Sequence, residues 1–236
     1  MKQPNCSLAK SISLCSLIGL MLTATAFAAE PEMDYREQFN HQSQGGIRIG
    51  VWGNLGDKPS AFGTNDTSSY ETNVKNASFY FEAYFGYRLA PAFMLEFAFG
   101  IVNRGDVTVV DNGDQYIGSL LVYPIQIRGK VYPLGAKTLG VQPYLMAGGG
   151  LYYGRNSIQF ASTSYYFDSF TGESQTDFNF MLGGGADWPL SHTVALDGNV
   201  SYMPINFSKT LISVKNYNAF TVTVGIKYLL PLKKNK

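Results

Sequence analysis

Side chains alternate between apolar and polar from Ala77 to Arg88, and this period of two constrains the fold more than any other feature of the sequence. Odd positions carry Ala, Phe, Phe, Ala, Phe and Tyr, whereas even positions carry Ser, Tyr, Glu, Tyr, Gly and Arg. After the short link LAPA, the alternation resumes with the same parity from Phe93 to Ile101. A period of two indicates a strand with two different faces, and roughly ten residues is the length that crosses an outer membrane at a tilt.

Six further segments repeat this pattern. They are Gly46–Trp52, Ser119–Tyr132, Val141–Gly154, Asp177–Trp188, Thr193–Met203 and Phe220–Leu230. Long polar connections, expected at 54–76, 103–118, 155–176 and 205–217, alternate with short links. Eight alternating strands joined in this way predict an all-β protein, an eight-stranded antiparallel up-and-down transmembrane β-barrel. Because short turns face the periplasm in such barrels, both termini are expected there.

The two ends of the chain are expected to lie outside the barrel. Residues 1–28 contain two lysines, an apolar run and the small-residue ending Ala26-Phe27-Ala28, the order found in a secretory signal peptide. A membrane-spanning anchor is the alternative, but it needs about 20 uninterrupted apolar residues. The predicted domains are a signal peptide at 1–28, a flexible periplasmic tail at 29–45, the barrel at 46–230 and a short periplasmic tail at 231–236.

Composition bears on the main alternative fold, a soluble exported β-protein of the lipocalin kind. The strands of such a protein would also alternate, but their polar faces would meet water and carry many Lys, Glu and Asp. Charged residues are only 15% of this chain, and the polar faces hold mainly Tyr, Gly and Met. The formal net charge of +1 offers no electrostatic case for nucleic acid. These observations favour a location in the outer membrane, with lipid against the apolar faces.

Charged residues on the polar faces are expected inside the barrel. By parity, the interior candidates are Arg48, Glu82, Arg88, Glu96, Arg128, Lys130, Asp187, Asp197 and Lys227. The interior of an eight-stranded barrel is just wide enough for side chains to fill it, and a charge there is costly unless it is paired. Two interpretations remain open: a mutually neutralised core that blocks water, or a narrow, gated path in which Arg128 and Lys130 attract anions.

Two glycine triplets, Gly148–Gly150 and Gly183–Gly185, fall in neighbouring predicted strands. A phosphate-binding glycine loop would require a following helix, and the sequence predicts none there. We therefore expect the triplets to let the sheet bend and to leave room for inward aromatic side chains such as Tyr144 and Tyr152.

From Phe79 onward the chain resembles the OmpW-like group of small outer-membrane β-barrels. The resemblance rests on FGYRLAPAFMLEFAFG, YPIQIRGKVYPL, VQPYLMAGGGLYYG and LGGGADWPLSHTVALDGNVSYM, whereas the long first loop is not family-like. The last strand also resembles the signal that barrel insertion machinery recognises, through Thr223, Gly225, Tyr228 and Leu230, although the chain continues past it with PLKKNK. The family implies an eight-stranded barrel with a narrow interior, and roles in moving small apolar compounds, in envelope integrity or as a surface receptor.

Enzymatic function is not expected. Both cysteines lie within residues 1–28, and the two histidines, His41 and His192, fall in a predicted periplasmic tail and turn, where neither adjoins a nucleophile at the outer surface. Asp111 and Asp114 belong to a sequence, DNGD, that typically forms a turn, so no metal site and no cofactor are predicted.

The functional hypothesis is an outer-membrane barrel that passes or binds small, largely apolar solutes through a narrow or gated interior. Trp52, inward at the outer end of the first strand, is the candidate for an apolar entry site. The alternative is a non-transporting envelope protein with a sealed polar interior and extracellular loops that bind a partner.

Overall fold

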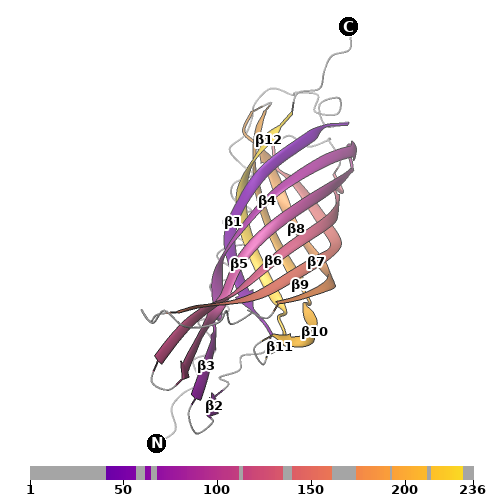
Figure 1. Ribbon diagram of the computed structural model, residues 1–236. Helices are drawn as coiled ribbons and strands as arrows, with labels where there is room; N and C mark the ends of the chain where they lie inside the picture. Colours follow the sequence, from indigo (N-terminus) through magenta and orange to yellow (C-terminus); the bar gives the residue numbers. More distant parts are fainter. Residues whose placement is uncertain are drawn as a thin grey trace, which may run out of the picture.

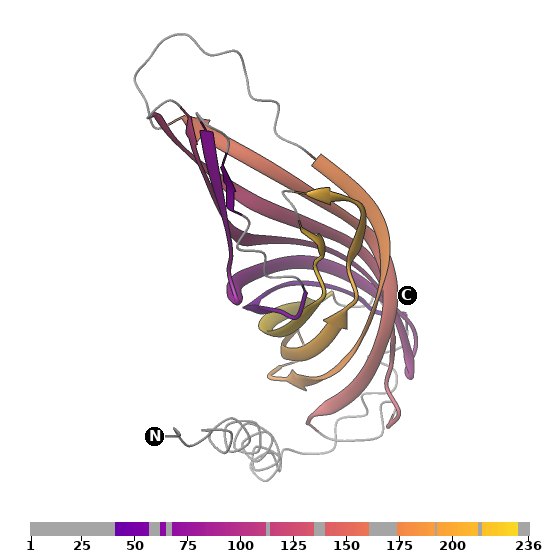
Figure 2. The same ribbon diagram turned by 90° about the horizontal axis from the view of Figure 1, so that it is seen from below.

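Backbone pairing runs without a break around a ring of eight strands in the computed structural model (Figures 1 and 2). The structure describes residues 41–56, 62–64, 68–111, 114–134, 140–160, 174–191, 193–211 and 214–230. The ring consists of β1 (Ser43–Asn54), β4 (Ala77–Ala90), β5 (Phe93–Asp111), β6 (Asp114–Val131), β7 (Gln142–Phe160), β8 (Ser174–Pro189), β9 (Val194–Met203) and β12 (Ala219–Leu229).

Closure of the ring comes from antiparallel pairing of β1 with β12, in a register that places Arg48 opposite Gly225. Every other neighbouring pair is also antiparallel, so the backbone groups of each strand pair with those of its two neighbours, with register shifts at Arg88/Ala90 and Asn103/Gly105. The predicted all-β, eight-stranded antiparallel barrel is therefore confirmed. Among the described residues, no helix combines the length and apolar character required to span a membrane.

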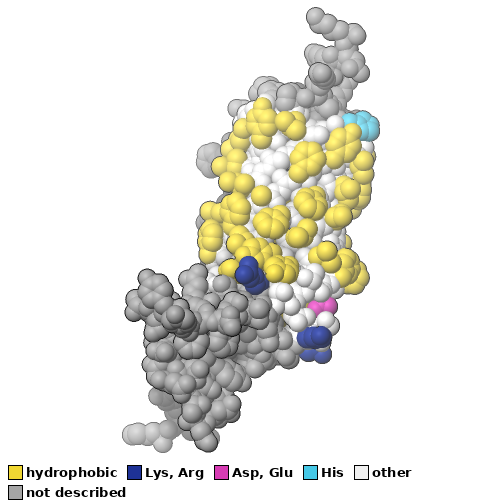
Figure 3. Space-filling model, in the orientation of Figure 1, with side chains coloured by type: hydrophobic (Ala, Val, Ile, Leu, Met, Phe, Trp, Pro, Cys, Tyr) yellow, Lys and Arg dark blue, Asp and Glu magenta, His cyan; other side chains and the backbone are white. Residues whose placement is uncertain are grey.

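The outer wall of the barrel is apolar, as the period of two predicts. Side chains exposed on the wall include Phe79, Phe97, Ile127, Leu145, Phe180, Leu182, Val224 and Ile226. Figure 3 shows hydrophobic side chains across the visible wall, with the Lys/Arg and Asp/Glu side chains of the described residues at its lower edge. Phe99 stacks on Tyr123, whose ring centroid lies 6.0 Å from that of Tyr153.

The predicted loops at one end of the barrel contain strands in their described parts, and most of the loop at 155–176 lies outside the described residues. Residues 54–76 contain β2 (Phe62–Thr64) and β3 (Ser68–Val74), and β3 pairs with the far end of β5. Residues 103–118 extend the β5–β6 hairpin to the pair Asp111 and Asp114, so the predicted loop there is wrong. Residues 205–217 contain the small hairpin of β10 (Asn206–Leu211) and β11 (Val214–Asn216). Cross-strand pairing beyond the membrane thus stiffens this end, here called the long-connection end.

The domain boundaries predicted from the sequence fall mostly beyond the described residues. The signal peptide at 1–28, most of the tail at 29–45 and the tail at 231–236 lie outside them. The first strand begins at Ser43 instead of Gly46, because Ser43 and Gln44 pair with Tyr87 and Gly86 of β4. The opposite end of the barrel, with its brief links such as 91–92, is here called the short-turn end.

Glycine in the interior face of β8 makes room for a tyrosine. A Cβ built on Gly185 would lie 2.2 Å from the Gly198 carbonyl oxygen and 2.6 Å from the Tyr144 hydroxyl oxygen. Tyr144 is buried in the space above this glycine. The expectation that the second triplet accommodates an inward aromatic side chain is confirmed at this position.

We predict that Gly185→Ala destabilises the barrel by about 1–3 kcal/mol, because the added methyl group overpacks the interior against backbone atoms that cannot move freely. Urea unfolding in detergent micelles measures the change. Gly198→Ala is the matched control on the neighbouring strand, since a Cβ there meets nothing within 4 Å. Equal stability of the two variants would contradict the packing role of Gly185.

Candidate functional site

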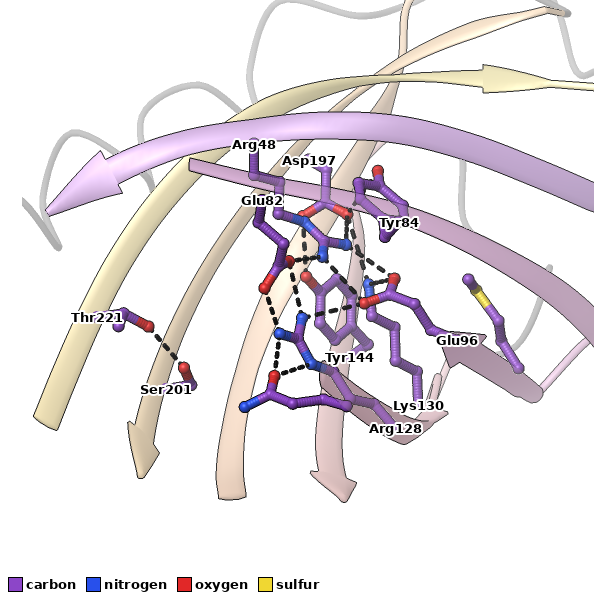
Figure 4. Close-up of polar contacts among 12 residues, drawn as sticks. Arg48, Glu82, Tyr84, Glu96, Arg128, Lys130, Tyr144, Asp197, Ser201 and Thr221 are labelled. Atoms are coloured by element: carbon purple, nitrogen blue, oxygen red, sulfur yellow. Dashed lines mark hydrogen bonds and ion pairs between the residues drawn. The ribbon is translucent and has the colours of Figure 1, made fainter. Parts of the chain in front are cut away.

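Six charged side chains from five strands meet at mid-depth in the barrel and form what we call the ion network (Figure 4). Its members are Arg48, Glu82, Glu96, Arg128, Lys130 and Asp197, and each is at most 3% exposed. The strand registers bring them together: Arg48 lies opposite Glu82, and Glu96 lies opposite Arg128. Three cations face three carboxylates, so the network is formally neutral.

Arg48 is at the centre of the network and contacts all three carboxylates. Its guanidinium nitrogens lie 2.5 Å from Glu82, 2.8 Å from Glu96 and 2.7 Å from Asp197. Asp197 is two strands away, beyond Gly225 of β12, where a Cβ would lie 2.8 Å from the Arg48 Cγ atom. The absence of a side chain at Gly225 therefore lets Arg48 reach across β12.

The other two cations of the network, Arg128 and Lys130, each contact two carboxylates. Arg128 donates to both Glu82, with one contact at 2.8 Å, and Glu96 at 3.2 Å. Lys130 lies 2.8 Å from Glu96 and 3.4 Å from Asp197. Because every carboxylate accepts from at least two cations, each buried charge is compensated, which offsets the cost of removing it from water.

Tyrosines surround the network and satisfy the remaining carboxylate oxygens. The Tyr80 hydroxyl donates to Glu82 at 2.8 Å, and the Tyr144 hydroxyl donates to Asp197 at 3.0 Å. The Arg48 guanidinium lies 3.6 Å from the centroid of the Tyr84 ring, in a cation–π contact. These contacts hold the cations and carboxylates in place across the interior of the barrel.

A second, smaller cluster lies toward the short-turn end. Lys227 forms an ion pair with Asp187, which also accepts from the Tyr132 hydroxyl at 2.8 Å. Arg88 lies 3.9 Å from the centroid of the Tyr132 ring and donates to the Pro91 carbonyl oxygen and to the side chain of Gln142. The structure thus places all nine predicted interior charges inside the barrel, six in the ion network and three here.

The interior changes character on the other side of the network, toward the long-connection end. Buried apolar side chains in this part of the lumen are here called the apolar cluster and include Trp52, Tyr80, Val102, Leu120, Phe207 and Tyr217. They are continuous with buried aromatic side chains at and beyond the network, such as Tyr144 and Tyr132. Trp52 is fully buried and meets the Tyr80 ring edge to face at 5.3 Å. The Phe207 and Tyr217 rings meet edge to face at 5.0 Å.

Arg104 is a buried interior charge that the sequence analysis missed. It was assigned to a loop, whereas the structure places it in β5, fully buried, with its guanidinium 5.6 Å from the centroid of Trp52. It lies at a β-bulge, because the register with β6 shifts between Asn103 and Gly105. Even-numbered positions of β5, such as Glu96 and Val102, face the interior, and Arg104 is the next even position after Val102. Extending the predicted strand by two residues would therefore have assigned Arg104 to the interior.

The residues of the expected assembly signal are divided between the two faces of β12. Thr223 and Gly225 face inward, whereas Tyr228 and Leu230 are 49% and 42% exposed on the lipid side. Among the described residues, no group of three or more His, Cys, Asp or Glu side chains has the arrangement of a metal site. The described interior thus combines a formally neutral network of charged side chains with an apolar cluster that contains one further cation, Arg104.

We predict that Glu96→Ala lowers the free energy of unfolding by about 3–5 kcal/mol, because it leaves three buried cations with one acceptor fewer. Urea unfolding in detergent micelles, followed by the heat-dependent shift in gel mobility, measures the loss. The control is Asp106→Ala, which removes an exposed pair with Lys75 at 3.1 Å and is expected to cost about 0–1 kcal/mol. A small cost for Glu96→Ala would mean that the network is not tightly coupled.

Comparison with known proteins agrees with this architecture. No curated protein matches the chain. The structure is similar to OprG from Pseudomonas aeruginosa, with 16% identity, 83% of this chain and 99% of that chain covered, and a TM-score of 0.52. It is also similar to Neisserial surface protein A, with 15% identity, coverage of 79% and 96%, and a TM-score of 0.51. At these identities the similarity shows the fold alone.

A family model identifies the chain more directly than these structures do. The model described as outer membrane protein beta-barrel domain matches residues 15–228, which is most of the sequence. The match agrees with the resemblance to small outer-membrane barrels and with an apolar wall facing lipid. The chain therefore belongs to the outer membrane protein beta-barrel family and is an outer-membrane protein.

Proposed function

We propose that this barrel binds small, largely apolar solutes in the apolar cluster around Trp52, and that the ion network gates the lumen beneath them. The long-connection end would face the outside and both termini the periplasm, because short turns are periplasmic in outer-membrane barrels. Export would depend on the signal peptide at 1–28, and membrane insertion on recognition of Thr223, Gly225, Tyr228 and Leu230 by the insertion machinery.

The observation that carries this proposal is the asymmetry of the lumen. Aromatic and aliphatic side chains occupy the interior at the long-connection end, whereas charged side chains occupy its middle. Ligand sites are mostly apolar with a few polar groups that fix orientation, and the mouths of barrels are common places for them. A solute that displaced part of the apolar cluster would exchange apolar contacts for apolar contacts, at little cost in solvation.

The ion network supports gating instead of open flow. Its members contact one another across the lumen at 2.5–3.4 Å, and their side chains are fully or almost fully buried. An eight-stranded barrel has little interior space beyond its own side chains. Passage would therefore require the charged side chains to move while they exchange partners, and a network that never does so would give the alternative function, a sealed envelope protein.

A binding role also fits the described polar groups better than catalysis does. His41 lies at the short-turn end, where its ring nitrogen is 3.3 Å from the Tyr87 hydroxyl, and His192 lies outside the described residues. The inward hydroxyls of Ser201 and Thr221 bond to each other at 2.6 Å, and no basic side chain is bonded to either of them in the described interior. We therefore propose a protein without enzymatic activity or cofactor.

Trp52 provides a direct test of solute binding, because the chain has only two tryptophans. In Trp188→Phe, Trp52 is the sole indole, and titration with cyclohexanol is expected to shift its emission in a saturable manner. The matched control, Trp52→Phe, retains only Trp188 on the outer wall and should respond weakly and without saturation. Identical responses in the two variants would mean that the solute enters the detergent or lipid and not the lumen.

Conductance tests the gate. The double variant Glu82→Ala with Arg128→Ala removes a bonded pair and leaves two cations and two carboxylates in the network. We expect a several-fold larger current than that of the unmodified protein in planar bilayers, because water can occupy the vacated space. Lys75→Ala with Asp106→Ala, a neutral change on the exposed surface, is the control. An unchanged current in a folded double variant would indicate that other residues close the lumen.

A further inference from the structure

We propose that Arg104 makes the apolar cluster a site for organic anions, with the guanidinium binding the carboxylate of a solute whose remaining body is apolar. This inference rests on the proposed function and specifies its solute class. Arg104 is a buried cation without a hydrogen-bond partner among the described residues.

Arg104 is fully buried, and none of its three guanidinium nitrogens has a hydrogen-bond partner among the residues that the structure describes. An arginine side chain stays protonated under all ordinary conditions, so the charge cannot be removed by loss of a proton. A buried charge without a partner is among the most unfavourable arrangements in a protein. The position therefore calls for a compensating anion that comes from outside the chain.

The other buried cations show how unusual Arg104 is. The described interior holds six cations, including Arg104, but only four carboxylates. The four carboxylates are already paired with Arg48, Arg128, Lys130 and Lys227. Arg88 has a backbone carbonyl oxygen at 2.6 Å and the Gln142 side chain at 3.1 Å. Among these six, only Arg104 has no hydrogen-bonded acceptor among the described residues.

Neighbouring polar atoms are also donors without partners. The indole nitrogen of Trp52 and the hydroxyl of Ser78 are buried and unbonded, and these two residues lie opposite each other in the β1–β4 register. The Trp52 ring lies 5.6 Å from the guanidinium carbon of Arg104. The Trp52 indole N–H and the Ser78 hydroxyl are therefore free to donate to an anion bound by Arg104.

The surroundings indicate the class of anion. A guanidinium binds a carboxylate through two parallel hydrogen bonds, and a single positive charge is balanced by a single negative one. The contacts beyond the charge come from the apolar cluster, including Tyr80, Val102 and Leu120. A free inorganic anion would leave these apolar contacts unused, whereas a monocarboxylate on an apolar body would use both parts of the site.

Binding of two solutes of equal size tests the proposal. In the Trp188→Phe protein, Trp52 emission is titrated with cyclohexanecarboxylate and with the uncharged cyclohexanecarboxamide. We expect the carboxylate to bind at least about tenfold more tightly, because buried hydrogen bonds to charged groups are the stronger ones. Adding Arg104→Met should abolish this preference while leaving amide binding in place. Sodium sulfate is expected to bind more weakly than the carboxylate.

Each other outcome has a distinct meaning. If the Trp188→Phe protein, which retains Arg104, binds the carboxylate and the amide equally tightly, this inference is overturned but the proposed solute site remains. If it binds neither compound, the proposed function is overturned. Sulfate binding as tight as that of the carboxylate would overturn the assignment of an organic anion. Unchanged carboxylate preference in Arg104→Met would assign the preference to another cation and overturn the role of Arg104.

Stability gives an independent readout that a purely structural arginine would not produce. Because Arg104 has no hydrogen-bond or ion-pair partner among the described residues, Arg104→Met should unfold at no lower urea concentration than the unmodified protein in the absence of added anion. Cyclohexanecarboxylate should raise the midpoint of the unmodified protein and not that of Arg104→Met, since a ligand stabilises only the state that binds it. A destabilised Arg104→Met protein that carboxylate still stabilises would contradict the proposal.

Discussion

Satisfaction of backbone hydrogen bonds in a medium without water is the constraint on which the whole structure depends. An isolated strand in lipid would leave its donors and acceptors unpaired, and only a closed ring removes both edges of the sheet. In this chain the closing pair is β1 with β12, the first and last strands of the barrel. Once the ring is closed, successive side chains along each strand face lipid and the lumen in alternation. The lumen is narrow because the ring has only eight strands.

The narrow lumen in turn demands that its charges be satisfied locally. At mid-depth this is achieved by six side chains that neutralise one another, and Arg48 reaches Asp197 only because Gly225 has no side chain. Toward the long-connection end aromatic and aliphatic side chains pack around Trp52, and the Arg104 guanidinium there has no hydrogen-bond partner among the described residues. The lumen thus contains a charged region at mid-depth and an apolar region toward the long-connection end. At the boundary between these two regions, the proposed solute binding and gating would be coupled.

Several parts of this arrangement were predictable because they follow from local patterns. The alternation from Ala77 to Ile101 identified both faces of β4 and β5, and it assigned Glu82 and Glu96 to the interior where the structure finds them. Other parts were not predictable from local patterns. Residues 103–118 were polar enough to suggest a loop, but long-range pairing with β3 and between the two halves of the hairpin holds them as strand.

The sequence by itself determined the class of the protein, its apolar wall and the polarity of each inward position, because a period of two depends only on residue order and on the geometry of an extended chain. Only the tertiary structure decided which inward residues meet. Register and closure bring Arg48 of β1 to Asp197 of β9, and a bulge carries Arg104 to Trp52 without bringing it a carboxylate. Those contacts join residues far apart along the chain, and no local pattern records the stagger between strands that creates them.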